Sequence, residues 1–293
     1  MQLRFLKVVL GALVTLVPFI LLSLAYGYDL HAITKGAEQG KAYAQHNLGV
    51  LYEIGEGVPK DYDQAVKWYR LAAEQGHSKA QYNLGIMYGT GKGVPQDDVK
   101  AEKWFRLAAE QGYTDAQIIL GFMYGTGKGV PQDDVQAEKW FRLAAEEAKA
   151  TAQNKLGNMY YFGNGVTQDD VKAVEWYRLA AEQGYAYAQY NLGVLCETGI
   201  GEPQNDAQAV KWYRLAAEQG HSKAQYNLGV MYAEGRGESQ DHKSAYIWFF
   251  IAEVNGIVGA KQNRDRAAKR LTQQELSQAQ REIAVHFEQL RGM

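Results

Sequence analysis

The sequence predicts an all-α solenoid, in which a helix–turn–helix unit repeats every 36 residues. The tryptophans stand at one phase of this period: Trp68, Trp104, Trp140, Trp176, Trp212 and Trp248. The same step separates alanines (Ala44, Ala80, Ala116, Ala152, Ala188, Ala224 and Ala260) and glycines (Gly49, Gly85, Gly121, Gly157, Gly193 and Gly229). A fixed period of this length is typical of stacked repeat proteins. Because each repeat contacts only its neighbours, such a stack offers a long surface and no enclosed catalytic cavity, so we expect a binding function.

One unit, beginning at Ala80, illustrates the first predicted helix. Ala80, Leu84 and Tyr88 recur every four residues and define one helix face. Ser78 is predicted to cap its N-terminus. Gly91 and Gly93 allow left-handed backbone and end the helix. Thr114 and Ser222 occupy the position of Ser78 in other units.

The second predicted helix follows at once. Asp97 is placed to cap it, and Gly112 ends it. Its apolar residues have the spacings of three and four that one helix face requires: Ala101, Trp104, Phe105, Ala108 and Ala109. We expect helices of about 11 and 15 residues. Gly85 and Ala101 lack bulk where the helices cross, and Trp104 and Tyr88 are expected to fill the space around them.

This pattern resembles the Sel1-like repeat, a relative of the tetratricopeptide repeat. The resemblance covers residues 44–259 as full units beginning at 44, 80, 116, 152, 188 and 224, within an array over residues 26–259. It implies a right-handed superhelix of helix pairs that acts as a non-catalytic adaptor for a protein or peptide partner. Residues 260–293 are expected to form a degenerate repeat and a capping helix, in which Thr272 and Glu275 make a capping box. Leu276, Ile283, Phe287 and Leu290 lie along the apolar face of that helix.

The resemblance also places candidate contact residues. In tetratricopeptide arrays the first helices line a concave groove, and positions two and six residues after each leading alanine correspond to groove positions. The predicted groove residues are His46, Val50, Tyr82, Ile86, Ile118, Phe122, Asn154, Asn158, Tyr190, Val194, Tyr226 and Val230. The alternative is that these residues pack between neighbouring units. The recurring asparagines beside them are assigned to structure: Asn47, Asn83, Asn191 and Asn227.

The first 25 residues predict export. Arg4 and Lys7 precede an uncharged stretch, and Ser23-Leu24-Ala25 offers the small-x-small pattern that a signal peptidase cleaves. The favoured interpretation is a signal peptide over residues 1–25, which places the mature protein in the periplasm or outside the cell. The alternative is an uncleaved membrane anchor, because a helix of the uncharged residues 8–26 would measure roughly 28 Å at about 1.5 Å per residue, close to the hydrocarbon thickness of a bilayer.

Charge and composition limit the classes of partner that the chain is expected to bind. Lys plus Arg (31) nearly balance Asp plus Glu (33), so nothing favours nucleic acid, and a membrane contact is expected only if the N-terminal segment is uncleaved. A single cysteine excludes an internal disulfide framework. Cys196 replaces a recurring tyrosine and is predicted to be a small buried side chain. Ala148 replaces a recurring glycine and puts the turn there in doubt.

Catalytic and metal-binding patterns are not supported. The loop 89–93 has the glycines of a phosphate-binding loop, but Ile86 and Gly93 stand where that motif requires Gly and Ser or Thr. His77 and His221 are interpreted as solvated turn residues. Aspartate pairs at 97–98, 133–134 and 169–170 are interpreted as helix caps. We therefore predict no cofactor, no metal and no enzymatic activity.

Two further functions stay open. Some Sel1-like repeat proteins are associated with peptidoglycan or beta-lactam recognition, but Ser78-Lys79 and Ser222-Lys223 are helix starts and not a supported Ser-Lys nucleophile. The other alternative is a membrane-tethered adaptor.

Overall fold

The computed structural model describes residues 30–291, without the side chains at 286 and 289–291. The described residues contain helices and no strands, which confirms the all-α prediction. The predicted signal peptide or anchor, residues 1–25, lies outside them. No helix among residues 30–291 is both long enough and apolar enough to span a membrane.

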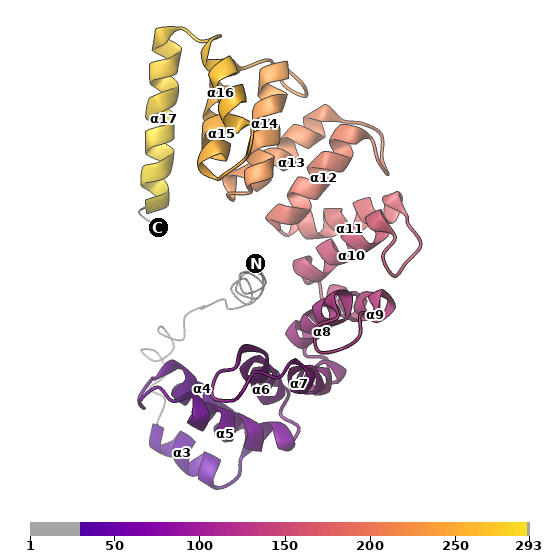
Figure 1. The fold of residues 1–293 in the computed structure, drawn as a ribbon, viewed down its shortest axis with the longest axis vertical. Coiled ribbons are helices and arrows are strands. Elements are labelled where there is room, and N and C mark those ends of the chain that lie inside the picture. The colour runs from indigo at the N-terminus through magenta and orange to yellow at the C-terminus, as the bar shows by residue number, and fades with distance from the viewer. Residues whose placement is uncertain (1–29, 292–293) are drawn as a thin grey trace. The chain divides into compact units, whose positions relative to one another are not determined.

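The chain divides into two compact units, Met1–Glu147 and Ala148–Met293. The first contains α3 (Leu30–Glu38), α4 (Ala42–Ile54), α5 (Tyr62–Glu74), α6 (Ser78–Thr90), α7 (Asp98–Glu110), α8 (Thr114–Thr126) and α9 (Asp134–Glu146). The second contains α10 (Ala150–Phe162), α11 (Asp170–Glu182), α12 (Ala186–Thr198), α13 (Asp206–Glu218), α14 (Ser222–Glu234), α15 (His242–Val254), α16 (Ala260–Ala268) and α17 (Gln273–Arg291). Within each unit, consecutive helices pack side by side as pairs (Figure 1).

Both helices of a repeat have 13 residues, so the predicted lengths of 11 and 15 were wrong. The N-cap of the first helix was also misplaced. His77, not Ser78, caps α6, because its Nδ1 accepts a hydrogen bond from the Ala80 amide at 3.2 Å. The cap predicted for the second helix is confirmed, since Asp97 accepts from the Lys100 amide at 2.9 Å. At the other positions of Ser78, Thr114 and Ser222 are likewise the first helical residues, not caps.

The glycine-rich loop between paired helices is a packing element. Gly93 has a φ of 65°, and a Cβ there would lie 2.3 Å from the Tyr62 carbonyl oxygen of the preceding repeat. A side chain is therefore excluded by both conformation and space. Close contact with the preceding repeat therefore explains the glycine at position 93.

The rings that fill each helix crossing are not the tryptophans. A Cβ on Gly85 would lie 2.7 Å from the ring of Phe105, which is 4% exposed, whereas Trp104 is half-buried. The residue after each tryptophan plays this part in every repeat: Tyr69, Phe105, Phe141, Tyr177, Tyr213 and Phe249. The prediction that Trp104 fills the crossing was therefore wrong by one residue.

A glutamine ladder links consecutive repeats. In one step of the ladder, the Gln111 side-chain amide donates to the Gln81 side-chain oxygen at 2.7 Å. The Gln81 side-chain amide in turn donates to the Ala73 carbonyl at 3.2 Å. Four other pairs repeat the first bond, each 30 residues apart: Gln75 with Gln45, Gln183 with Gln153, Gln219 with Gln189, and Asn255 with Gln225. Position 147 holds Glu, which has no amide to donate, and the Gln117 Oε1 atom is buried without a hydrogen-bond partner.

The turn at Ala148 keeps the backbone of the glycines that it replaces. Its φ is 55°, in the left-handed region, where glycines at the equivalent positions have φ of 82–86°. A residue with a Cβ in this region costs roughly 1–2 kcal/mol. The sequence alone did not settle the conformation of this turn. In the structure, Ala148 adopts the left-handed conformation of the equivalent glycines and bears this energetic cost.

The capping box predicted in the C-terminal tail is confirmed. Thr272 and Glu275 form the capping box: the Thr272 amide donates to the Glu275 carboxylate at 2.7 Å, and the Glu275 amide donates to the Thr272 hydroxyl at 3.2 Å. Helix α17 then packs on α15 through Leu276, Ile283 and Phe287. The Leu290 side chain lies outside the described part.

Candidate functional site

The predicted groove residues lie along the first helices of each compact unit, and we call them the first-helix row of that unit. It consists of His46, Val50, Tyr82, Ile86, Ile118 and Phe122 in one unit, and of Asn154, Asn158, Tyr190, Val194, Tyr226 and Val230 in the other. Most of these side chains are half-buried. Ile118 and Asn154 are the exceptions, at 1% and 5% exposed, so their assignment as partner contacts is corrected. Ile118 is taken into the core, and Asn154 is used by the neighbouring helix.

The first position of the row stacks on the turn that precedes the next first helix. His46 stacks on His77 with ring centroids 4.9 Å apart, and Tyr190 stacks on His221 at 4.5 Å. Tyr82 contacts Tyr113 at 4.9 Å. These rings therefore contribute to packing between repeats, as the alternative interpretation predicted, while part of each ring stays accessible.

Asparagines of the following first helix form hydrogen bonds with side chains at the first position of the row. Asn191 donates to the Asn154 side-chain oxygen at 3.1 Å, and Asn83 pairs with His46 Nε2 at 3.3 Å. Asn263 donates to the Tyr226 hydroxyl at 2.9 Å. The structural role predicted for Asn83 and Asn191 is confirmed.

The second position of the row is anchored by the paired second helix. Phe122 makes an edge-to-face contact with Phe141, with centroids 5.3 Å apart. Asn158 accepts a hydrogen bond from the Tyr177 hydroxyl at 2.7 Å. The aliphatic members, such as Val194 and Val230, are half-buried and pack against the repeat cores.

Sequence reasoning missed the most exposed apolar side chains beside the row. Tyr43 and Tyr187 are 59% and 55% exposed, and Phe162 is 64% exposed. Tyr187 lies against His221, with ring centroids 5.0 Å apart, and so extends the Tyr190 stack to the surface. The sequence does place both tyrosines directly before a leading alanine. The other repeats hold polar residues at that position, so the tyrosines do not recur with the period.

The remaining candidate groups have structural partners. The Cys196 thiol is 2% exposed and donates to the Glu202 carboxylate at 3.1 Å, which confirms the predicted burial. Burial and that carboxylate raise the pKa of Cys196 to about 12, so the nucleophilic thiolate is disfavoured. His221 caps α14 as His77 caps α6, so neither is the solvated turn residue that was predicted. Among the described residues, no three His, Cys, Asp or Glu side chains gather to hold a metal ion.

Burial makes His46 a pH-sensitive part of the row. The pKa of His46 is lowered from 6.5 to about 4, chiefly by desolvation; a hydrogen bond to Asn47 opposes this shift, and the charges of His77 and Lys79 add to it. The unfolded chain therefore binds a proton more readily than the folded chain. The resulting stability is complete above pH 6.5 and is lost as the pH falls toward 4.

We expect the free energy of unfolding of the N-terminal repeats to fall by about 1–2 kcal/mol between pH 7 and pH 5 through His46 alone. His46→Tyr, which copies Tyr190 in the equivalent repeat, should make this dependence shallower. Urea unfolding of both proteins at the two pH values measures the difference. Equal pH dependence of the two chains would mean that His46 is not held neutral by the fold.

Comparison with known proteins agrees with this geometry. The Sel1 repeat model matches residues 42–77, 78–113, 114–148, 150–185, 186–221 and 222–253. The chain is 33% identical to a Sel1 repeat protein from Oxalobacter formigenes, over 79% of this chain and 94% of that one, with a TM-score of 0.69.

Two further solved structures are similar to this chain. One is c5321, a protective antigen present in uropathogenic Escherichia coli strains, with 30% identity over 87% of this chain and 86% of that one, and a TM-score of 0.42. Another is the immunity protein Pa5087 from Pseudomonas aeruginosa, with 22% identity over 73% and 81% of the two chains, and a TM-score of 0.44. No curated protein gave a significant match. The six matched repeats, which cover most of the chain, establish that it belongs to the Sel1 repeat family.

Proposed function

We propose that this protein is an exported, non-catalytic scaffold that binds a protein or an extended peptide along its first-helix row. The supporting observation is the aromatic surface at Tyr187, where an exposed ring continues into the Tyr190–His221 stack. Rigid aromatic side chains of this kind provide most of the energy of protein interfaces. Stacking holds the rings in place before binding, so little conformational entropy is lost when a partner docks.

The unit Met1–Glu147 carries a similar surface. Tyr43 is exposed at the position equivalent to Tyr187, and the His46–His77 stack is equivalent to the stack of Tyr190 on His221. We propose that both surfaces serve partner binding. Export is proposed on the strength of the basic start, apolar stretch and small-x-small pattern of residues 1–25.

The test is partner capture with the chain beginning at Tyr26, from the organism that makes it, followed by affinity measurement. Tyr187→Ser should weaken binding by about 1–2 kcal/mol, the scale of an interface hot spot. It should leave the melting temperature nearly unchanged, because a side chain that is 55% exposed contributes little to the core.

The matched control is Val171→Ser, which removes an apolar side chain of similar exposure, 56%, from the second helix α11. This control should bind as the unaltered chain does. If Tyr187→Ser and Val171→Ser bind the captured partner equally well, the aromatic surface is not the binding site. If the chain hydrolyses the captured partner, and substitution of Cys196, His77 or His221 abolishes that hydrolysis, the protein is an enzyme instead.

A further inference from the structure

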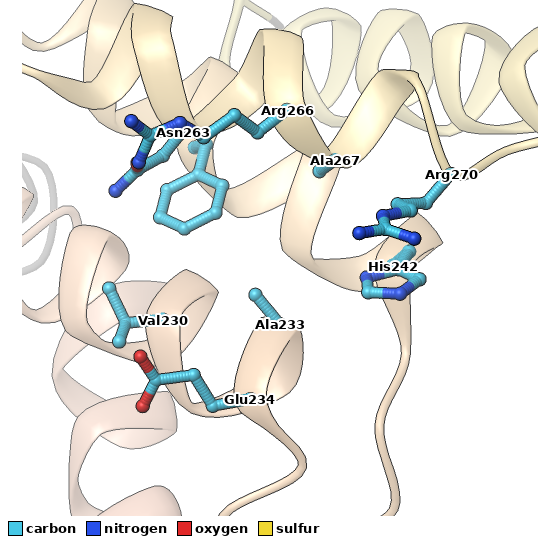
Figure 2. Close-up of a pocket in the computed structure, with 9 residues that line it drawn as sticks. Val230, Ala233, Glu234, His242, Asn263, Arg266, Ala267 and Arg270 are labelled. Carbon is cyan, nitrogen blue, oxygen red and sulfur yellow. The ribbon is translucent and has the colours of Figure 1, made fainter.

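A pocket of about 240 Å³ opens at the C-terminal end of the first-helix row, within the unit Ala148–Met293. Figure 2 shows Val230, Ala233 and Glu234 of α14 on one side, facing Asn263, Arg266, Ala267 and Arg270 on the other. His242 and Phe249 of α15 complete the lining. The pocket therefore combines an apolar floor with two cationic side chains at its rim.

The two arginines lack the carboxylate partners that neighbouring arginines have. Arg178, Arg214, Arg236 and Arg264 each form an ion pair, at 2.5–2.9 Å. Among the described residues, Arg266 and Arg270 form no ion pair. The contact of Arg266 is a long hydrogen bond to the Asn263 side-chain oxygen, at 3.4 Å. Two guanidinium groups that line one pocket and that no carboxylate pairs with favour an anion.

The interior adds an unsatisfied polar atom. The Nδ1 atom of His242 is buried without a hydrogen-bond partner. A buried polar atom left unpaired is costly, and a ligand oxygen or a water can remove that cost. Glu234, the acidic side chain of the lining, lies 3.6 Å from the Arg236 guanidinium, which also pairs with Glu197 and Asp206. The lining still carries two guanidinium groups, of Arg266 and Arg270, against this one carboxylate.

We propose that this pocket binds the carboxylate end of a peptide chain, with the last side chain, an apolar one, against Val230, Ala233 and Phe249. Arg266 and Arg270 bind the carboxylate, and Nδ1 of His242 contributes a hydrogen bond. The volume is below the range of about 300–1,000 Å³ that is common for small-molecule sites, so it suits one terminal residue better than a continuing chain.

This inference rests on the proposed function, because the pocket continues the first-helix row. Val230 belongs to both, and Asn263 of the pocket donates to Tyr226 of the row. A peptide lying along the row of this unit would reach the pocket at its end. The inference adds the orientation of the partner and the chemistry of its terminus.

The experiment is a ligand-observed NMR titration of the full chain with N-acetyl-L-leucine, and with N-acetyl-L-leucinamide, which has the same apolar body and no charge. We expect the acid to bind at least about tenfold more tightly than the amide, as a charge-assisted hydrogen bond requires. The double variant Arg266→Gln, Arg270→Gln should lose this preference. Lys261→Gln, an exposed cation of the same helix α16 outside the pocket, should keep it.

Equal binding of acid and amide would overturn the proposal, and so would unchanged affinity of the double variant. Inorganic phosphate is the third probe. Tighter binding of phosphate than of N-acetyl-L-leucine, lost in the same double variant, would assign the pocket to inorganic anions and also overturn it. Failure here leaves the proposed function standing if Tyr187→Ser still weakens partner binding, so the two outcomes are distinguishable.

Discussion

Trp140→Ala should lower the free energy of unfolding by about 3–5 kcal/mol, the range for deleting a large buried aromatic side chain. Trp140 is 6% exposed within α9, and alanine would leave a cavity that the close-packed repeat fills poorly. The loss falls toward the lower end of the range, because the indole Nε1 atom is buried without a hydrogen-bond partner and its removal relieves that cost. Urea unfolding followed by far-ultraviolet circular dichroism measures the change.

Trp104→Ala is the internal comparison. Trp104 occupies the same phase of the preceding repeat but is half-buried, so its loss should be smaller. A cost under about 1 kcal/mol for Trp140→Ala, the scale of surface substitutions, would contradict the burial of this ring.

Gly85→Ala should destabilise the protein by about 1–3 kcal/mol, although alanine is the better helix former. The added Cβ would lie 2.7 Å from the ring of Phe105, which is itself 4% exposed and has no free space to move into. The new methyl group therefore forces the two helices of the repeat apart. Thermal and urea unfolding of the variant measure the cost.

Gly89→Ala tests the same substitution four residues later in α6. There the nearest atom, the Ala101 Cβ, is at an ordinary contact distance of 3.7 Å. With no clash, the gain in helix propensity should stabilise the chain by up to about 1 kcal/mol. If both variants shift stability in the same direction, close approach of the helices is not the reason for Gly85.

The period of the sequence was sufficient to predict the architecture, because the same residues recur wherever the same contacts recur. Helix ends were less predictable, since a cap depends on which side chain reaches the free amides. Histidine does so at His77, where serine had seemed the natural cap. The ring at each crossing was misassigned because Trp104 and Phe105 are adjacent in sequence, and only the rotation of the helix decides which of them faces Gly85.

The candidate site was less predictable than the fold. Correspondence by position treats all repeats alike, so it included Ile118 and Asn154, which are buried. The predicted row also ended before α16. Arg266 of this helix and Arg270, just after its end, have no equivalent arginine at the same phase in the other repeats. A site formed where the period ends leaves no periodic signal.

The glutamine ladder has an evolutionary consequence. Its donor and acceptor, such as Gln219 and Gln189, are the same residue type at a fixed step of 30 residues. Inside a unit, loss or gain of one whole period of 36 residues therefore joins two glutamines that had never been neighbours, and their bond forms again. Recombination within the gene can therefore change the number of repeats while the glutamine ladder stays intact. The near-identical segments 87–110 and 123–146 are consistent with such a duplication. A change that is not a whole number of periods breaks this step and separates donor from acceptor; an acceptor that has lost its donor is seen at Gln117, where position 147 holds Glu.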